Sequence, residues 1–375
     1  GLACHTMPPQ YITHANGPHA RVTCEECHLG RASLAVQIPR KIQYSWQTGS
    51  SLVFHTYVYP IRAKSMRPAV DACETCHYPE TFSGDKLLTL DKYGLDEKNT
   101  KTSISLLLKT GGGTKREGLG NGIHWHIENP VYYYSEDPEK QSIPYIRVTL
   151  PDGSIEEYVD IQANFDKSKL ESNQLEKMDC NTCHNRVSHQ ILTPSAAMDQ
   201  LLSRALISPD IPDIRKKGEE LLAAKYDTDE AAFQAFQTLD TFYQQNYADF
   251  YKDHADLVKN AVQAIQNQYK VSSFIDQQMF WTSHPDNIGH ESAPGCFRCH
   301  DGKHLSAEKE AVRLECNLCH SIPVVSGASD LVTTIELNRG VEPQSHLNSN
   351  WITIHNQVFD SSCQTCHTVG NPGGS

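Results

Sequence analysis

The sequence predicts a mainly α-helical and irregular fold that contains a small antiparallel β insertion. Three observations lead to it. Residues 195–283 hold no cysteine and space their apolar residues three or four apart, residues 100–165 contain strand-like runs around turn residues, and only 38% of the 375 residues are hydrophobic. That percentage is low for a chain long enough to form two or three domains, which indicates that something besides side chains fills part of the core.

Charge and hydropathy exclude one class of partner and one class of structure. The 33 basic and 45 acidic residues give a net charge of −12, so nonspecific nucleic-acid binding driven by phosphate neutralisation is not expected. The longest wholly apolar runs are pieces such as Leu106–Leu108, far below the roughly 20 residues that a membrane span needs, and no signal peptide is visible. The sequence as given predicts a soluble chain.

Twelve of the 13 cysteines form six C-x-x-C pairs, and His follows every pair. The motifs are Cys24/Cys27/His28, Cys73/Cys76/His77, Cys180/Cys183/His184, Cys296/Cys299/His300, Cys316/Cys319/His320 and Cys363/Cys366/His367. Because His occupies only 19 of 375 positions, six matches by accident have a probability on the order of 10⁻⁸. The pattern is typical of covalent haem c attachment, in which two thiols add to the haem vinyl groups and the adjacent His becomes the proximal iron ligand. The predicted fold is therefore that of a haem-packed multihaem cytochrome c.

Other interpretations of the paired cysteines explain less. Three Cys4 zinc sites would give no reason for the six histidines, thioredoxin-like chemistry would need one motif in a βαβ setting, and disulfides would not need the histidines either. The expected cofactor is haem c, and the six motifs specify six haems. Because haem c is attached outside the cytoplasm, the motifs also predict a periplasmic or extracellular location.

Cys4 and His5 indicate a seventh haem with an incomplete motif, because Gly1 stands where the first Cys of C-x-x-C-H would be. This haem would hang by one thioether, or by a longer C-x-x-x-C-H motif if a Cys precedes the sequence given. A lipidated cysteine is one alternative, although the run Gly-Leu-Ala-Cys has Gly where the acylation signal prefers a larger apolar residue. A free thiol is the other alternative.

The remaining histidines supply candidate distal ligands. Seven motif histidines, counting His5, leave twelve others out of 19, which is enough to give every iron a second imidazole. The candidates are His19, His124, His126, His189, His290, His304 and His355, with His346 in a similar position before Cys363. His254 lies in a polar helical stretch and is expected at the surface, while His14, His55 and His284 stay undecided. Two imidazoles saturate the iron, which favours electron transfer over small-molecule chemistry.

The motifs divide the chain into four regions. Residues 1–95 form a haem region whose first 80 residues read as Pro-containing and loop-rich, and residues 96–170 form the β insertion with distal histidines. Residues 171–285 hold one motif followed by helices, and residues 286–375 hold three haems.

Individual elements follow from local patterns. The expected strands are Ser103–Leu108 and a hairpin of Tyr145–Leu150 with Ile155–Val159 around the turn Pro151–Ser154. Alternation on an extended segment would turn His124 and His126 toward two different haems. The glycine-rich loop that ends at Gly122 lacks a P-loop ending and is expected to let the backbone approach a haem or the Ile123–His126 strand closely. Helices are predicted by the stripes Phe233, Phe236, Leu239, Phe242, Tyr243 and Leu257, Val258, Ala261, Ile265, Tyr269.

The motif order resembles the NapC/NirT family of membrane-anchored multihaem quinol dehydrogenases, and in particular its larger heptahaem members. The similarity covers most of residues 1–320. The segments that carry it are Cys4–Met7, Tyr11–His19, Val22–His28, Cys73–His77, Ile123–His126, Met178–Arg186 and Asn287–Gly302.

The resemblance implies a periplasmic domain on an N-terminal membrane helix, with electrons entering from quinol at the haem nearest the bilayer. It also implies that Met7, rather than His5, could ligate the first iron. Two features depart from the family: Gly1 replaces the expected first Cys, and the sequence given holds no preceding helix. The motif at Cys363 lies beyond the resemblance, which suggests an added terminal haem.

Three functions remain open on the sequence. The first is an electron carrier that links membrane quinol, or a membrane complex, to other redox proteins outside the cytoplasm. The second is a subunit that self-assembles into an extracellular cytochrome filament, for which terminal haems near Cys4 and Cys363 would be suited. The third is a haem enzyme that reduces a nitrogen or sulfur oxyanion, although no C-x-x-C-Lys motif supports it.

Overall fold

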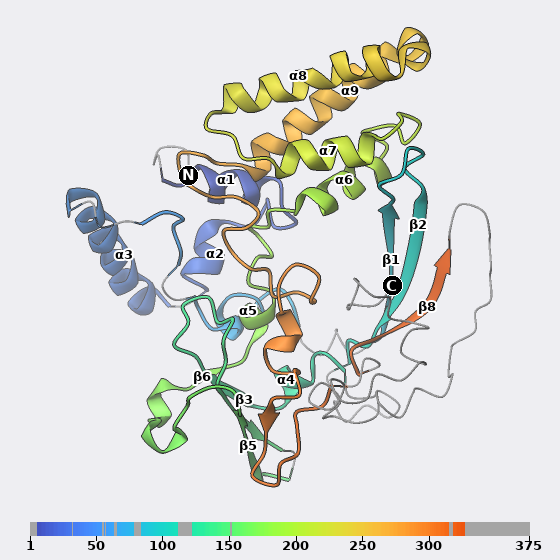
Figure 1. The fold of residues 1–375 in the computed structure, drawn as a ribbon. Helices are drawn as coiled ribbons and strands as arrows, with labels where there is room; N and C mark the ends of the chain where they lie inside the picture. Colours follow the sequence, from blue (N-terminus) through green and yellow to red (C-terminus); the bar gives the residue numbers. More distant parts are fainter. Residues whose placement is uncertain are drawn as a thin grey trace.

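The computed structural model describes residues 6–31, 33–54, 56, 58–63, 66–78, 84–111, 122–150, 152–314 and 318–326. The helices of residues 194–272 lie together at one end of the molecule, and the 21-residue helix Leu34–Phe54 lies apart from them at one side (Figure 1). Short helices and turns occupy the middle, and two antiparallel sheets lie beside and beyond them. This arrangement agrees with the predicted mixture of helices, irregular segments and small antiparallel sheets.

The helices are α1 (Pro8–Ala15), α2 (Cys24–His28), α3 (Leu34–Phe54), α4 (Trp125–Glu128), α5 (Cys180–Cys183), α6 (Pro194–Ser203), α7 (Ile214–Ala223), α8 (Asp229–Asn246) and α9 (Ala248–Ser272). The strands are β1 (Lys86–Tyr93), β2 (Lys101–Leu108), β3 (Val131–Tyr134), β4 (Tyr145–Thr149), β5 (Ile155–Asp160), β6 (Glu176–Lys177), β7 (His304–Leu305) and β8 (His320–Ser326). None of the helices in the described part of the chain is long and apolar enough to cross a membrane.

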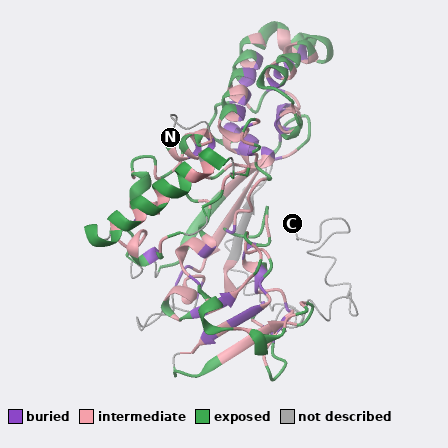
Figure 2. Ribbon diagram, turned by 90° about the vertical axis from the view of Figure 1, so that its left-hand side faces the viewer, coloured by how far each residue is buried: buried purple, intermediate pink, exposed green. Residues whose placement is uncertain are grey.

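Helices α6–α9 form a unit with its own apolar core. Thr193 and Thr228 cap α6 and α8, because each hydroxyl accepts a hydrogen bond from a backbone N–H of the first turn. The predicted stripes face inward, and Phe236, Tyr243 and Ile265 are fully buried. Figure 2 shows the buried positions gathered between these helices. The helical prediction for this region is confirmed.

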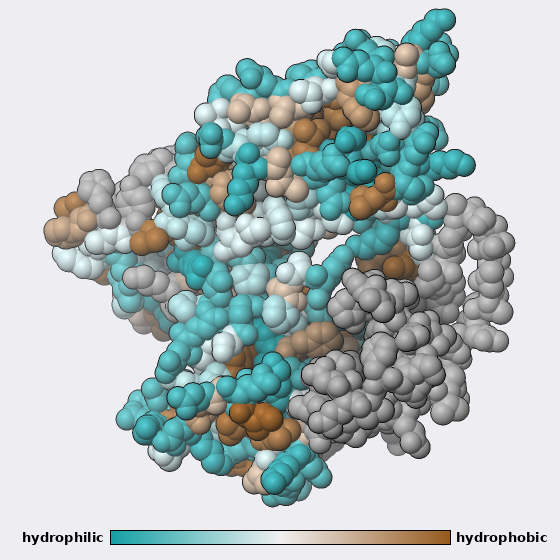
Figure 3. Space-filling model, viewed as in Figure 1, coloured by the Kyte–Doolittle hydropathy of each residue, from teal (hydrophilic) through white to brown (hydrophobic). Residues whose placement is uncertain are grey.

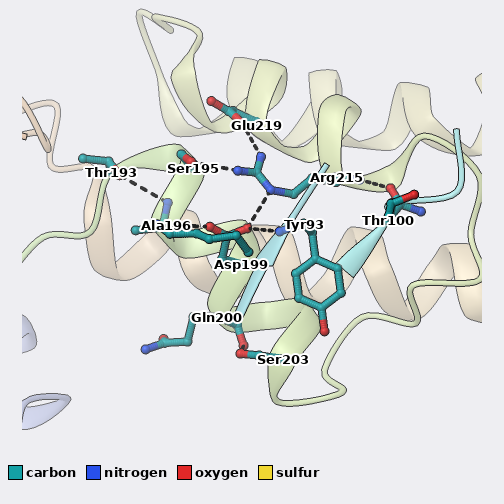
Figure 4. Close-up of polar contacts among 12 residues, drawn as sticks. Tyr93, Thr100, Thr193, Ser195, Ala196, Asp199, Gln200, Ser203, Arg215 and Glu219 are labelled. Carbon is teal, nitrogen blue, oxygen red and sulfur yellow. Dashed lines mark hydrogen bonds and ion pairs between the residues drawn. The ribbon is translucent and has the colours of Figure 1, made fainter. Parts of the chain in front are cut away.

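A buried ion pair joins the helical unit to the first sheet (Figure 4). Arg215 of α7 donates from Nε to Asp199 of α6 at 3.0 Å, and the backbone N–H of Tyr93 in β1 donates to the same carboxylate oxygen at 3.1 Å. Arg215 also donates to the Ser195 hydroxyl at 2.8 Å. Because both charges are nearly buried, these partners are needed to offset their desolvation.

The two sheets have strand orders β1-β2-β8 and β6-β3-β4-β5-β7, and all pairs are antiparallel. The predicted hairpin is confirmed, with Val148 opposite Glu156 and Thr149 opposite Ile155. The prediction of a strand at Ser103–Leu108 is also confirmed, as part of β2. Both sheets include strands from outside residues 96–170, namely β1, β6, β7 and β8.

The surroundings of Gly122 explain why the predicted loop ends in a glycine. Its N–H donates to the Gly111 carbonyl at 2.8 Å, and a Cβ at this position would lie 2.2 Å from the Lys109 carbonyl oxygen. A side chain would therefore collide with the end of β2. The close approach at Gly122 is therefore made to the end of β2 rather than to residues 123–126. An approach of this loop to a haem stays a prediction, and residues 112–121 lie outside the described residues.

Two local predictions are wrong. The sequence predicts that residues 1–80 are loop-rich, but they contain α1, α2 and the 21-residue helix α3. It also predicts an extended segment at His124 and His126, but His124 is the residue before α4 and His126 lies within that single helical turn. Alternation over four residues is too short a pattern to distinguish a strand from one turn of helix.

Candidate haem-binding sites

In four motifs that the structure describes, a single helical turn places both thiols and the imidazole on one face. In three motifs the His N–H donates to the carbonyl of the first Cys, from His77 to Cys73 at 2.8 Å, from His184 to Cys180 at 2.7 Å and from His300 to Cys296 at 3.0 Å. The motif at Cys24 forms the short helix α2 itself. Residues at i, i+3 and i+4 of a helical turn are neighbours, so both thiols and the imidazole can face the same group.

The motif cysteines that the structure describes form no disulfide, and most of them are at least partly buried. Burial raises the pKa of Cys183 to about 11 and that of Cys299 to about 12, and it also raises the pKa of Cys27 and Cys296. These buried thiols are therefore protonated at neutral pH in the chain without cofactor, the form in which a thiol adds to a vinyl group as S–H. The nine described cysteines are Cys24, Cys27, Cys73, Cys76, Cys180, Cys183, Cys296, Cys299 and Cys319.

Cys76 and Cys319 lie in different surroundings: Cys76 is exposed, as is Cys24, whereas Cys319 is partly buried like most of the described motif cysteines. Cys76 is exposed, because its motif forms a turn at the surface, and the neighbouring Thr75 hydroxyl donates to its sulfur at 3.9 Å. Cys319 is partly buried in the turn before β8, and its carbonyl accepts from the Lys109 N–H at 2.8 Å. That bond fixes the backbone of Cys319 beside the end of β2. Thioether attachment at both cysteines stays a prediction.

Four motif histidines each lie opposite a second histidine. The distances between ring centroids are 6.0 Å for His77 and His19, 6.4 Å for His28 and His189, 5.8 Å for His300 and His126, and 6.1 Å for His320 and His290. Every second member is a predicted distal ligand. The structure therefore brings together residues that lie as far apart in sequence as His28 and His189.

These distances fit a metal held between two imidazoles. With metal–nitrogen bonds of about 2.0 Å on each side, the two ring centroids are separated by about 6.3 Å. The four measured separations lie between 5.8 and 6.4 Å. The cysteines and histidines of this chain thus fit haem iron with two axial imidazoles.

Two of these imidazoles are oriented by backbone carbonyls. Nδ1 of His126 lies 2.9 Å from the Ile123 carbonyl oxygen, and Nδ1 of His300 is hydrogen-bonded to the Arg313 carbonyl. A donor at Nδ1 leaves the Nε2 lone pair for a metal, which is the usual arrangement of ligating histidines. Burial lowers the pKa of His126, and it lowers that of His300 to about 4, so both rings are neutral, as a ligand must be.

His184 and His124 make a fifth association. The pKa of His184 is lowered first by burial and then by the nearby His124. His124 therefore lies near one motif histidine, and His126 lies opposite another, His300. In a helical turn, side chains at positions i and i+2 point in directions about 200° apart. The turn therefore directs His124 and His126 to different sides, as the predicted extended segment would also have done.

His304 has a different environment from the one predicted. Its Nδ1 lies 2.9 Å from an oxygen of Asp301, its Nε2 lies 2.6 Å from the Ile143 carbonyl oxygen, and the ring is almost fully buried. Burial alone would lower the pKa of His304, but these two hydrogen bonds outweigh it and raise the pKa. This geometry argues against the predicted ligand role, because neither ring nitrogen is available to iron.

Of the three undecided histidines, His14 and His284 lie in the described part of the chain. The ring centroid of His14 lies 6.3 Å from that of His189, and the ring centroid of His28 lies 6.4 Å from it. Three imidazoles therefore cluster between α1 and α2. His284 is nearly buried, and its Nδ1 lies 3.4 Å from Glu139. His254 is exposed, as predicted, and its ring packs against Phe250 at a kink in α9.

Several predicted site residues lie outside the described part of the chain. They are Cys4, His5, His55, Cys316, His346, His355, Cys363, Cys366 and His367. Met7, the alternative ligand of the first iron, is described and is 38% exposed. The predictions for these residues stay predictions.

Neighbouring motifs are held together in the order Cys24, Cys73, Cys180, Cys296. Arg31 follows the first motif, and Asp71 precedes the second. The backbone N–H of Arg31 donates a hydrogen bond to the Asp71 carbonyl oxygen at 3.0 Å. Asp179, just before the third motif, accepts from the Ala69 N–H at 3.0 Å. In the fourth motif, Arg298 donates from Nη2 to the Thr182 carbonyl of the third at 3.0 Å. The order along the chain is therefore also the order in space.

The sequence reasoning did not identify the residues that make these links. Arg298 and Thr182 occupy the variable positions between the cysteines, and Asn287 donates from Nδ2 to the same Thr182 carbonyl at 3.1 Å. Arg298 also donates to the Gly295 and Lys140 carbonyls, both at 2.9 Å. An arginine inside a motif was a visible signal, but its acceptors follow only from the fold.

Comparison with known proteins gives one informative match. The chain is 34% identical over 371 residues to the cytochrome c-type protein ImcH of Geobacter sulfurreducens, an alignment that covers 98% of this chain and 71% of that protein. No protein-family model and no solved structure matches the chain.

Proposed function

The chain belongs to the family of multihaem c-type cytochromes that includes ImcH, and from that premise we propose that it carries single electrons along a row of seven covalently attached haems. The observation that supports this proposal best is the pairing of motif histidines with second histidines at 5.8 to 6.4 Å. Two imidazoles leave no open position on iron, so each centre is suited to electron transfer.

The residues of the chain have three tasks in this proposal. The motif cysteines attach each haem through thioethers, and His28, His77, His184, His300 and His320 are the proximal ligands. The distal ligands are His189, His19, His124, His126 and His290, in the same order. Haem c supplies iron that gains and loses one electron. The protein sets the potential through ligand identity, burial and hydrogen bonds such as those at Nδ1 of His126 and His300.

The distal ligands come from segments next to other motifs. His19 precedes Cys24 but faces His77, His189 follows His184 but faces His28, and His290 precedes Cys296 but faces His320. Each of these three haems would therefore tie two motif segments together, whereas His124 and His126 come from a segment without a motif. This arrangement supports closely spaced centres that pass electrons in the order of the motifs.

The donor and the location complete the proposal. Haem c is attached outside the cytoplasm, so we place the protein in the periplasm or the extracellular space. Following the resemblance to the NapC/NirT family, the donor is membrane quinol or a membrane complex, and the acceptor is another redox protein. The filament alternative depends on the motifs at Cys4 and Cys363, and the paired histidines give no support to the oxyanion reductase.

Carbon monoxide tests whether the iron positions are saturated. We expect that the visible spectrum of the dithionite-reduced holoprotein responds at no more than one haem per chain, namely the one at Cys4, where the motif is incomplete and Met7 is the alternative ligand. A response at two or more haems would favour small-molecule chemistry over electron transfer.

A ligand exchange tests whether the assigned pairs set the potentials. Replacing His126→Met exchanges one imidazole for a thioether, which raises a haem potential, here on the order of 100 mV. A potentiometric titration of the visible spectrum should show the change at one haem only. His254→Met is the matched control, because His254 is exposed on α9. Equal titrations for both variants and the wild type would contradict the assignment of His126.

A further inference from the structure

Helix α3 turns an apolar face toward solvent. Leu34, Ile38, Ile42 and Trp46 recur at four-residue intervals, so they line one side of the helix. Their exposed fractions are 72%, 54%, 65% and 76%. Figure 3 shows apolar side chains at the outer end of α3. An apolar stripe this exposed on a protein marks an interaction surface.

The rest of the described structure leaves this face uncovered. α3 makes no extensive contact with any other described helix or strand, and Figures 1 and 2 both show it projecting from the body. An ion pair attaches it near the first described motif, with Lys41 Nζ 3.2 Å from Glu25 of α2. The apolar side of α3 is therefore held next to Cys24 and faces outward.

Charge indicates what covers the face. No Asp or Glu occurs among the 44 residues from Cys27 to Val70, although the chain has 45 acidic residues and a net charge of −12. The same segment has six basic residues, which are Arg31, Arg40, Lys41, Arg62, Lys64 and Arg67. An apolar stripe with basic neighbours is complementary to a bilayer surface that carries anionic headgroups.

We propose that α3 lies in the plane of an anionic phospholipid bilayer, with Leu34, Ile38, Ile42 and Trp46 inserted at the interface. The helix also contains three glutamines, Arg40, Lys41 and the internal Pro39, so it is too polar for a span. A second copy of this chain is a poorer occupant, because a two-fold contact through this face would bring the same basic residues of both copies together.

The contact goes beyond electron transfer, because it assigns a membrane-binding surface within the folded chain. It would hold α2, with Cys24 and His28, close to the lipid surface. A chain that conducts electrons but does not bind lipid through α3 would leave the proposed function intact, so the two proposals fail separately.

Vesicle binding by the haem-loaded 375-residue chain tests the proposal. Co-sedimentation is measured with vesicles of phosphatidylcholine that contain phosphatidylglycerol. The double variant Ile42→Glu/Trp46→Glu should weaken binding at least ten-fold, and Arg40→Gln should weaken it about five-fold, because each basic residue near an anionic surface adds to the attraction. Haem absorbance of each variant verifies that it is loaded.

The matched control is Ile155→Glu/Ile161→Glu, which places the same charges at two residues that are 60% and 56% exposed at the ends of β5. It should bind vesicles as the wild type does. Three results would overturn the proposal: a wild-type chain that does not bind vesicles, equal loss in both double variants, or an α3 variant that only converts a dimer into a monomer in light scattering.

Discussion

The helical unit of α6–α9 and the motif region are stabilised in different ways. Eighteen buried residues form the core cluster of the helical unit, all but Tyr93 from residues 197–269, whereas seven form the cluster around β3 and β4 near Cys299. The motif region instead brings together thiols and imidazoles, polar groups that do not form an apolar core. In this region the covalently attached haems would supply the apolar volume.

The low hydrophobic content of the sequence therefore belongs to the motif region and not to the helical unit. The helical unit follows ordinary rules, with apolar stripes at helical spacing packed at near-zero exposure. The motif region would meet the same need with few apolar side chains, because each proposed haem is a large apolar group that two cysteines and two histidines would anchor. The helical unit should therefore fold without cofactor, and the motif region should not.

Removing the cofactor should have the largest effect. When the chain is produced without haem attachment, we expect hydrogen exchange in the motif region to lose its protection, while residues 194–272 stay protected. Proteolysis of the apo-chain should then leave a resistant fragment that covers α6–α9. Uniform loss, or uniform retention, of protection would break the comparison between the two regions.

A core truncation should separate the regions in the opposite direction. Phe236 of α8 is fully buried against Tyr226 and Tyr269, so Phe236→Ala should destabilise the helical unit by about 3–5 kcal/mol. The measurement is denaturant unfolding followed by far-ultraviolet circular dichroism. The visible spectrum of the holoprotein should stay unchanged, and a change in haem ligation would contradict the independence of the two regions.

A smaller loss is expected where two motifs are linked. Arg298→Ala removes donors to the Thr182, Gly295 and Lys140 carbonyls, and the expected loss is about 2–4 kcal/mol of local stability. Hydrogen exchange of the segments around Cys180 and Cys296 measures it. Arg204→Ala, at an exposed position after α6, is the control and should have little effect. Equal hydrogen-exchange rates in the two variants would show that Arg298 does not link the motifs at Cys180 and Cys296.

The smallest effect concerns a helix cap. The Thr228 hydroxyl accepts from the Ala231 N–H at 3.1 Å, so Thr228→Ala should cost about 1 kcal/mol of unfolding free energy in the helical unit. Chemical denaturation checks the value. Thr228→Ser should retain the cap and most of the stability, and an equal loss in both variants would show that the hydroxyl is not what stabilises α8.

The sequence predicted elements that depend on local pattern. The hairpin follows from its turn, and α8 and α9 follow from stripes that include Phe236 and Ile265. α3 was missed because Pro39 and Gly49 interrupt it, although Leu34, Ile38 and Ile42 at four-residue spacing would have revealed it. Four residues around His124 were too few to separate a strand from a turn of helix.

The candidate sites were predictable only in part. The motifs specify which cysteines and histidines act together, because those residues lie within one helical turn. The partner of each motif histidine depends on contacts between distant segments, such as His28 with His189, and spacing carries no information about them. His304 illustrates the limit: its closeness to Cys299 in sequence suggested a ligand, but Asp301 and Ile143 occupy both its nitrogens.

Electron paramagnetic resonance of the fully oxidised holoprotein at low temperature, with spin quantitation, tests the central claim most directly. The pairs of motif and distal histidines predict at least five low-spin ferric irons per chain. They also predict two types of low-spin signal, because the ring planes are near-perpendicular for His126 with His300 at 90° and closer to parallel for His290 with His320 at 26°. High-spin signals from two or more irons per chain would contradict the claim.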